Sequence, residues 1–211
     1  MVNVIGLGYI GLPTALMLSS HGVTVIGTDY NKELVETLNA GKTTFKETGL
    51  DDLFQSALQS GISFTTDYQI TDIYIVSVPT PYDKFSKKVD DVYVVSAVEK
   101  ILQYAPNEAT IVVESTISPG TIEKSIRPIL EKAKRLDIHL VHAPERIIPG
   151  NMVYELLHNN RTIGADDKKV GERIKQIYAS LQLLEELFYQ LSLRLQPWSQ
   201  QVMHSIKIGT P

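Results

Sequence analysis

Three glycines with close spacing form the first group of residues that could do chemistry. The segment Gly6-Leu7-Gly8-Tyr9-Ile10-Gly11 follows an apolar run over residues 2–5 and precedes a segment with helical spacing of apolar residues. In a strand–turn–helix unit, the first glycine permits a tight turn, the second lets a pyrophosphate approach, and the third allows close helix packing. Free N–H groups and the helix dipole attract the phosphate charge. The spacing predicts a dinucleotide site, with Tyr9 and Ile10 in the same loop.

Asp29 stands 18 residues after Gly11, at the end of the next predicted strand. A carboxylate at this place accepts hydrogen bonds from both ribose hydroxyls and repels a 2′-phosphate, which favours NAD over NADP. The alternative is a structural strand–helix turn in which Asp29 caps the following helix.

Polar residues also follow three later apolar runs. Val78-Pro79-Thr80-Pro81 ends one run, and Glu114-Ser115-Thr116 ends the next. Such positions lie at the carboxyl edge of a parallel sheet, where open α/β folds bind ligands, although turn and cap chemistry explains them equally well. After the third run, Glu145 and Arg146 stand side by side, either as a base beside an anion clamp or as a surface ion pair.

Strands and helices must alternate to position these residues. This pattern predicts βαβ units and an α/β fold with a doubly wound, mostly parallel sheet of the Rossmann type. The predicted strands cover residues 2–5, 23–27, 62–65, 72–78, 110–113, 138–141 and 162–164. The predicted helices cover residues 9–20, 31–39, 50–58, 92–104, 119–135, a short piece after Gly150, and 167–181.

The composition narrows the class of protein. The chain has 211 residues, 43% of them hydrophobic and 21% charged, which suits one large globular domain or one domain plus an appendage. A net charge of −4 without clusters of Lys and Arg argues against a nucleic-acid or membrane partner. No targeting or membrane-spanning segment is expected, so the predicted location is cytoplasmic. With no cysteine, the chain has no disulfide, thiolate metal site or cysteine nucleophile, and no bound metal is expected.

Four segments, in this order, resemble those of the UDP-glucose/GDP-mannose dehydrogenase superfamily of nucleotide-sugar 6-dehydrogenases. They are Val4–Pro13, Val78–Pro81, Glu114–Thr116 and Pro144–Arg146, and the resemblance covers about residues 1–181. It implies an NAD-dependent, two-step oxidation of the C6 hydroxyl of a UDP-sugar to a carboxylate. The UDP-glucose branch has a second acidic residue four positions after the Glu145 equivalent, where this chain has Pro149. Together with the segment 159–164, this is similar to the branch that acts on UDP-N-acetylmannosamine.

The resemblance also implies roles for particular residues. It implies that Thr116 lies near the reacting sugar carbon and that Glu145 activates or positions the water of the hydrolytic half-reaction. Glu145, Arg146 and Arg161 become expected substrate contacts, with local pairing as the alternative for Arg161. The implied NAD contacts are Gly6, Gly8, Tyr9, Ile10, Gly11, Asp29, Pro79, Thr80, Ser115 and Thr116.

The resemblance ends near Leu181. The family continues with a long helix that supplies a catalytic Lys and Asn, and with a substrate domain that carries a Cys and an Asp, and none of these can be placed here. We therefore expect an NAD-binding domain over residues 1–181 and a partly helical tail over 182–211 that is out of frame or otherwise divergent, which makes the chain a truncated gene product. The helical expectation rests on the spacing of Leu184, Phe188, Leu191 and Leu195.

Three functions remain compatible with this sequence. The first is the cofactor-binding part of the family enzyme, inactive by itself and binding its UDP-sugar weakly or not at all. The second is a non-catalytic nucleotide-binding module, and the third is another NAD dehydrogenase of the β-hydroxyacid type. A homo-oligomer stays open, through a surface other than the missing helix.

Overall fold

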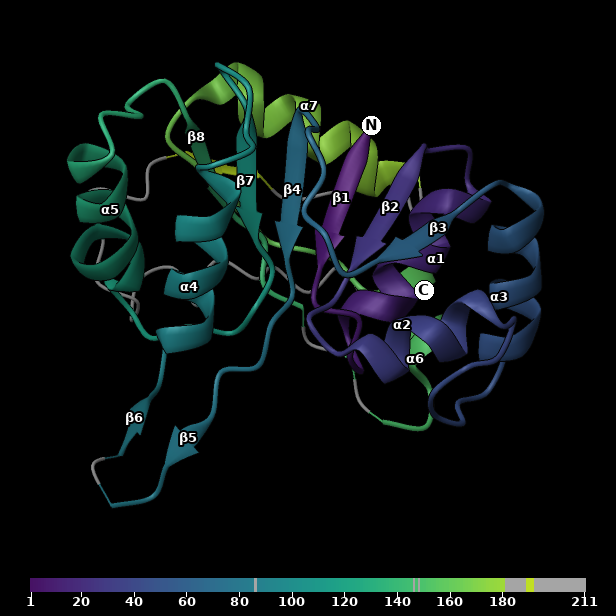
Figure 1. Ribbon diagram of the computed structural model, residues 1–211. Coiled ribbons are helices and arrows are strands. Elements are labelled where there is room, and N and C mark those ends of the chain that lie inside the picture. The colour runs from purple at the N-terminus through teal and green to yellow at the C-terminus, as the bar shows by residue number, and fades with distance from the viewer. Residues whose placement is uncertain (86, 146, 148, 181–188, 192–211) are drawn as a thin grey trace, which may run out of the picture.

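The protein is built around one twisted sheet of eight strands, in the order β10-β9-β8-β7-β4-β1-β2-β3 (Figure 1). The computed structural model describes residues 1–85, 87–145, 147, 149–180 and 189–191. All neighbouring strands pair in parallel except β8 and β9, which are antiparallel. The strands are β1 (Val2–Ile5), β2 (Val25–Thr28), β3 (Ser63–Thr65), β4 (Ile73–Val76), β7 (Thr110–Val113), β8 (His139–His142), β9 (Ile163–Ala165) and β10 (Tyr189–Leu191). This confirms the predicted doubly wound, mostly parallel sheet.

Helices cover both faces of the sheet, because the central strands are apolar on both sides. Val4 and Ile75 belong to one buried core, which also contains residues of α1, α2, α3, α6 and α7. Ile5 and Val76 belong to a second core, filled from α4, η1 and α5. The helices are α1 (Gly11–Ser20), α2 (Lys32–Asn39), α3 (Leu50–Gln59), α4 (Val92–Ile101), the π-helix η1 (Ile122–Ile126), α5 (Arg127–Lys132), α6 (Met152–His158) and α7 (Lys168–Ala179).

Two segments differ from the sequence-based expectation. The helix predicted over residues 119–135 is a π-helix followed by α5, with Pro128 in the first turn of α5. Proline has no N–H group to continue a regular helical hydrogen-bond ladder, which accounts for the break. After Pro79 and Pro81, a hairpin of β5 (Tyr82–Asp83) and β6 (Lys88–Val89) projects from the body (Figure 1). The sequence analysis did not predict this hairpin.

The tail also differs where the structure describes it. Residues 189–191 form β10 and pair in parallel with β9, so the helix predicted through Leu191 is wrong at these residues. The exposed edge of β9 offers unpaired backbone groups, and an extended segment satisfies them. The rest of the predicted tail, 182–188 and 192–211, lies outside the described residues.

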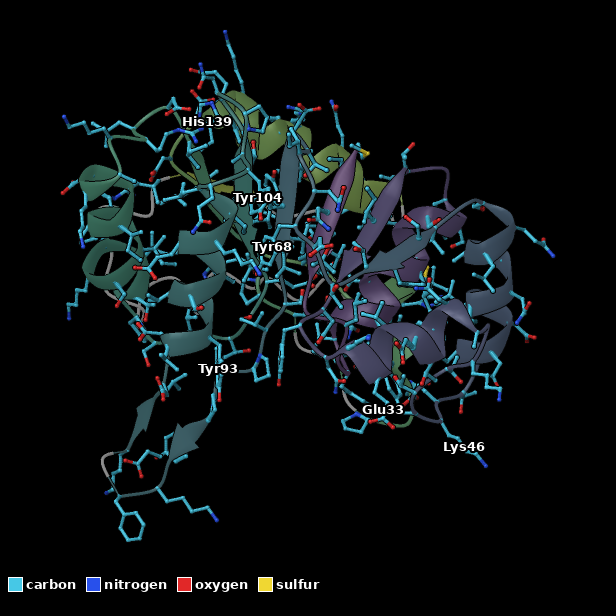
Figure 2. All side chains as sticks on the ribbon, in the orientation of Figure 1. Glu33, Lys46, Tyr68, Tyr93, Tyr104 and His139 are labelled. Carbon is cyan, nitrogen blue, oxygen red and sulfur yellow. The ribbon has the colours of Figure 1, made fainter. Side chains whose placement is uncertain are left out.

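The strands bring the functional segments to one edge of the sheet. β1, β2, β4, β7 and β8 all end at this edge, which is the edge predicted to bind ligand. Figure 2 labels Tyr93 and Glu33 toward this end of the molecule and His139 at the opposite end, where β8 begins. Among the helices that the structure describes, none has the length and apolar character needed to cross a membrane.

Candidate functional site

The glycine loop between β1 and α1 has the shape of a phosphate cradle. Gly6 has a φ of +90°, and a Cβ there would lie 2.8 Å from the carbonyl oxygen of Ser77. A Cβ on Gly11 would lie 1.8 Å from the carbonyl oxygen of Gly6, so this position is open only to glycine. Gly8 has no protein atom within 4 Å of the place where a Cβ would stand. The loop thus leaves space over Gly8 beside the N-terminus of α1, which fits a bound pyrophosphate.

Asp29 is held by the loop that it faces. Its Oδ2 accepts a hydrogen bond from the Leu7 N–H at 2.7 Å, and its Oδ1 accepts one from the Asn31 N–H at 2.9 Å. Asn31, not Asp29, caps α2, because its side chain accepts the Leu34 N–H. The alternative role of Asp29 as a helix cap is therefore wrong, and its carboxylate lies at the cavity wall.

An open cavity of about 530 Å³ runs along this edge of the sheet. It brings together nearly all the residues that the sequence analysis assigned to a site. Those in its wall are Gly6, Gly8, Tyr9, Ile10, Asp29, Pro79, Thr80, Ser115, Thr116 and Glu145. Gly11 instead packs beneath the loop, and Arg146 lies outside the described residues.

A second cavity of about 400 Å³ shares Gly6, Asp29 and Pro79 with the first and continues toward α4. Its wall includes Tyr68 and Lys100, whose Nζ lies 4.8 Å from the centre of the Tyr68 ring. Burial, together with the charge of Asp29, raises the pKa of Tyr68 to about 12, so the phenol stays neutral. The sequence analysis missed this half of the site, because its residues are spread along the chain without a local motif.

Ser115 connects the ends of two neighbouring strands. Its hydroxyl donates a hydrogen bond to the carbonyl oxygen of Val78 at 2.7 Å, just before Pro79 and Thr80. The hydroxyl therefore holds the segment that carries Thr80 against the end of β7. The next residue, Thr116, is exposed at the cavity wall.

The floor of the cavity contains a charged cluster that sequence spacing did not reveal. Arg161 forms ion pairs with Glu114 and Glu145, and the exposed fractions of the three side chains are 4%, 0% and 8%. The Ser77 hydroxyl also donates to Glu114, and the Thr14 hydroxyl does so at 3.3 Å. Glu114 and Glu145 are both among the residues that line the cavity.

Arg161 lies behind these two carboxylates and not in the cavity wall described above, so its guanidinium is directed at the protein. Its guanidinium carbon lies 4.0 Å from the centre of the Tyr178 ring. Burial lowers the pKa of Arg161, but its interactions with Tyr178 and Glu114 raise the pKa overall, so it stays charged. Burial, and then the charge of Glu114, raises the pKa of Tyr178. The geometry therefore shows Arg161 in local ion pairs, which is the alternative to the expected substrate contact.

A further bridge joins the glycine loop to the loop that carries Glu145. The Tyr9 hydroxyl donates to Glu47 at 2.6 Å, and the same carboxylate accepts the N–H groups of Gly150 and Met152 at 2.9 and 3.2 Å. Met152 begins α6, so Glu47 also satisfies the N-terminus of that helix. Glu47 thus connects two walls of the same cavity.

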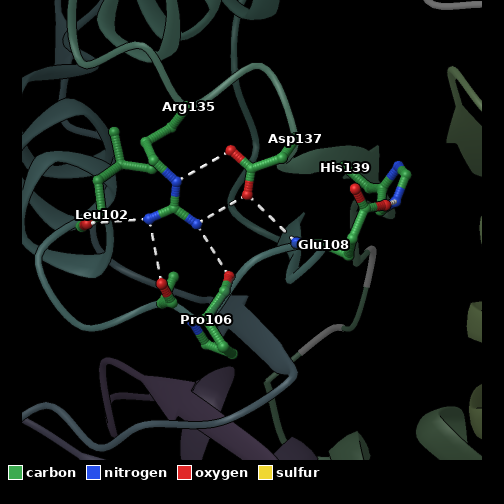
Figure 3. A network of polar contacts seen from close by, with 7 residues as sticks. Leu102, Pro106, Glu108, Arg135, Asp137 and His139 are labelled. Atoms are coloured by element: carbon green, nitrogen blue, oxygen red, sulfur yellow. Dashed lines mark hydrogen bonds and ion pairs between the residues drawn. The ribbon is translucent and has the colours of Figure 1, made fainter.

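The other polar network is far from the cavity, where β7 and β8 begin (Figure 3). Arg135 donates to both carboxylate oxygens of Asp137 and to the carbonyl oxygens of Leu102, Ala105 and Pro106. It joins neighbouring turns and has no place in the site. Among the described residues, no group of His, Asp and Glu side chains is arranged to hold a metal ion.

Comparison with known proteins agrees with this geometry. Residues 1–182 match the model of the UDP-glucose/GDP-mannose dehydrogenase family, NAD binding domain. A UDP-N-acetyl-D-mannosamine dehydrogenase of Methanococcus aeolicus is 45% identical over 182 residues, which are 85% of this chain and 41% of that protein.

Solved structures show the same likeness. The UDP-N-acetyl-mannosamine dehydrogenase of Staphylococcus aureus superposes with a TM-score of 0.81 and 37% identity, over 90% of this chain and 46% of that one. A ternary complex of GDP-mannose dehydrogenase from Pseudomonas aeruginosa gives a TM-score of 0.78 and 28% identity, over 90% and 45% of the two chains. This chain spans less than half the length of these relatives. The chain belongs to the UDP-glucose/GDP-mannose dehydrogenase family, and it contains that family's NAD-binding domain.

Proposed function

We propose that this chain binds NAD along the cavity and forms the cofactor half of an enzyme that oxidises the C6 hydroxyl of a UDP-N-acetylhexosamine. UDP-N-acetylmannosamine is the proposed substrate, since dehydrogenases named for this sugar nucleotide match the chain over residues that include the site. The observation that carries the proposal is the cradle at Gly6, Gly8 and Gly11 beside the carboxylate of Asp29.

The residues divide the cofactor between the two cavities. Asp29 would accept hydrogen bonds from the adenosine ribose, and Tyr68 and Lys100 lie where the adenine would follow. The pyrophosphate would lie over Gly8 at the N-terminus of α1. Pro79, Thr80, Ser115 and Thr116 would then surround the nicotinamide end. NAD supplies a hydride acceptor there.

Glu145 is the proposed water-positioning residue for the hydrolytic step, because it lines the same cavity as Thr116. Arg161 would hold that carboxylate in place from the protein side. Arg146 remains a proposed substrate contact.

The family's second oxidation uses a thiol, and this chain has no cysteine. We therefore propose binding without turnover for this chain alone; its cytoplasmic location and any oligomer stay predictions.

Calorimetry on the unmodified chain tests the proposal. We expect binding of NAD, weaker binding of NADP, and weak or absent binding of UDP-N-acetylmannosamine. Absorbance of NADH is expected to stay flat when NAD and the UDP-sugar are both present. Failure to bind NAD would overturn the cofactor assignment, and sustained NADH production would overturn the assignment as a non-catalytic half. If the chain binds NAD but does not change the activity of an intact family enzyme to which it is added, the non-catalytic module is favoured.

A further inference from the structure

An acidic residue lines the cavity toward each end of the proposed cofactor site. Asp29 follows β2, and Glu114 follows β7, with β1 and β4 between these strands. Three strand spacings separate the ends of β2 and β7 by about 14 Å, a span that an extended dinucleotide covers between its two ribose groups. With the adenosine ribose at Asp29, the other end of the cofactor reaches Glu114.

Glu114 faces this end with its carboxylate oriented by the protein. Its oxygens accept hydrogen bonds from Ser77 and Thr14, and Arg161 pairs with it from behind the cavity wall. Glu145 shares that guanidinium and also lies in the wall. Glu114 and Glu145 are thus lining residues of the cavity, whereas Arg161 is not among the residues that line it.

The two forms of the cofactor differ in charge at this place. The nicotinamide ring of NAD⁺ is a cation, and it becomes neutral when it accepts a hydride. A fixed carboxylate near the ring stabilises the cation and has little effect on the neutral ring. At a separation of roughly 7 Å and an effective dielectric constant of about 20, one such charge changes the ratio of the two affinities by roughly 50-fold.

We propose that Glu114, supported by Glu145 and counterbalanced from behind by Arg161, sets the preference of the site for NAD⁺ over NADH. This specificity rests on the proposed function, since it requires the nicotinamide end to lie at Glu114. Its consequence is release of the reduced cofactor, because the attraction is lost when the ring becomes neutral.

Affinities for NAD⁺ and NADH, measured by calorimetry on the same preparations of the full chain, test the assignment. Glu114→Gln keeps the shape and removes the charge, and it is expected to lower the preference for NAD⁺ by roughly 50-fold. Glu145→Gln is expected to shift the ratio in the same direction. Arg161→Lys keeps the positive charge and is expected to leave the ratio near its original value.

Asp29→Asn serves as the matched control, because it removes a charge at the adenosine end of the same cavity. It is expected to weaken binding of both forms by the same factor. A merely structural role for Glu114 would likewise weaken both forms equally, and that result would overturn the assignment. If Glu114→Gln fails to fold, Glu145→Gln decides the question by the same ratio. Binding of neither form by the unmodified chain would instead show that the proposed function is wrong.

Discussion

Arg161 and Glu114 form an ion pair in which the side chains are 4% and 0% exposed, although 47 residues separate them in the sequence. Glu145 accepts from the same guanidinium, and the ring of Tyr178 lies against it. A buried charge is tolerated only when it is paired and hydrogen-bonded. The cluster therefore holds the floor of the cavity in place, and the loss of any one of its members leaves another buried charge without its partner.

Arg161→Met is expected to destabilise the fold strongly. It leaves the buried Glu114 without its cation, and such a loss lowers the free energy of unfolding by about 3–5 kcal/mol. Urea denaturation measures this. Lys32→Met is the matched control, since Lys32 and Glu36 lie 3.6 Å apart and are 82% and 66% exposed, and it is expected to cost less than about 1 kcal/mol. Equal losses in the two variants would contradict the prediction.

Two glycine variants separate folding from cofactor binding. Gly11→Ala places a Cβ 1.8 Å from the carbonyl oxygen of Gly6, so we expect a loss of several kcal/mol, about 3 or more, in unfolding free energy. Gly8→Ala meets no protein atom within 4 Å and is expected to keep stability within about 1 kcal/mol. The same methyl group enters the space of the pyrophosphate, so NAD affinity is expected to fall at least about tenfold. Thermal unfolding and calorimetry measure the two effects, and unchanged NAD affinity in Gly8→Ala would refute the cradle.

Asp29→Asn is expected to weaken NAD binding by about 1–2 kcal/mol, since hydrogen bonds to a charged acceptor contribute that much. Loss of the carboxylate also removes its repulsion of a 2′-phosphate, so the preference for NAD over NADP is expected to narrow. Competitive titration with both cofactors measures the ratio. Asp52→Asn, at an exposed position of α3, is the control and is expected to leave the ratio unchanged. An unaltered ratio in Asp29→Asn would place the ribose elsewhere.

His142 is expected to make stability depend on pH between about 6.5 and 4. Its Nε2 is buried without a hydrogen-bond partner, and burial lowers the pKa of His142 to about 4, against a weaker opposing effect of the hydrogen bond that the imidazole donates to the Ser115 backbone. Since the unfolded histidine titrates near 6.5, only the unfolded chain takes up this proton in that interval. Stability is complete above about pH 6.5 and falls toward pH 4, by up to roughly 3 kcal/mol.

Urea denaturation across this pH range tests the role of His142. His142→Gln is expected to flatten the slope, and the exposed His21→Gln is expected to keep it. If both variants keep the original slope, the pH dependence comes from other groups.

Asp137 is expected to make stability depend on pH in a range below that of His142. The hydrogen bonds from Arg135 lower the pKa of Asp137 to about 2 (Figure 3). Its contribution to stability is complete above the unfolded pKa, near 3.9, and is lost as the pH falls toward 2. The difference in unfolding free energy between the original chain and Asp137→Asn is expected to shrink by about half from pH 6 to pH 3. If the difference in unfolding free energy stays constant between pH 6 and pH 3, the prediction is contradicted.

Local patterns predicted the parts of the molecule that local sequence controls. The Gly6–Gly11 loop, Asp29 and the alternation of strands and helices follow from spacing and flanking residues, because a turn or a cap depends on neighbours in sequence. The break before α5 follows from Pro128, which the sequence also contains, but the prediction considered only the proline at the start of the segment.

The cluster at the cavity floor could not be predicted in the same way. Glu114, Glu145 and Arg161 meet because three separate strands place them there, and no local pattern encodes their pairing. The Tyr68 side of the site has the same origin. Such contacts come from tertiary packing, which spacing within a segment does not report.

The antiparallel pairing of β9 with β8 has a consequence for how the chain completes its own site. The charged residues that line the 530 Å³ cavity, Asp29, Glu114 and Glu145, each follow a strand, whereas Arg161, which pairs with two of them, comes just before one. Because β9 runs backward, its beginning stands beside the end of β8, with Gly164 opposite His142. A forward-running β9 would put Arg161 at the far rim, a full strand length from Glu114. The antiparallel direction of β9 thus places Arg161 at the same edge of the sheet as Glu114 and Glu145, which follow the parallel strands β7 and β8.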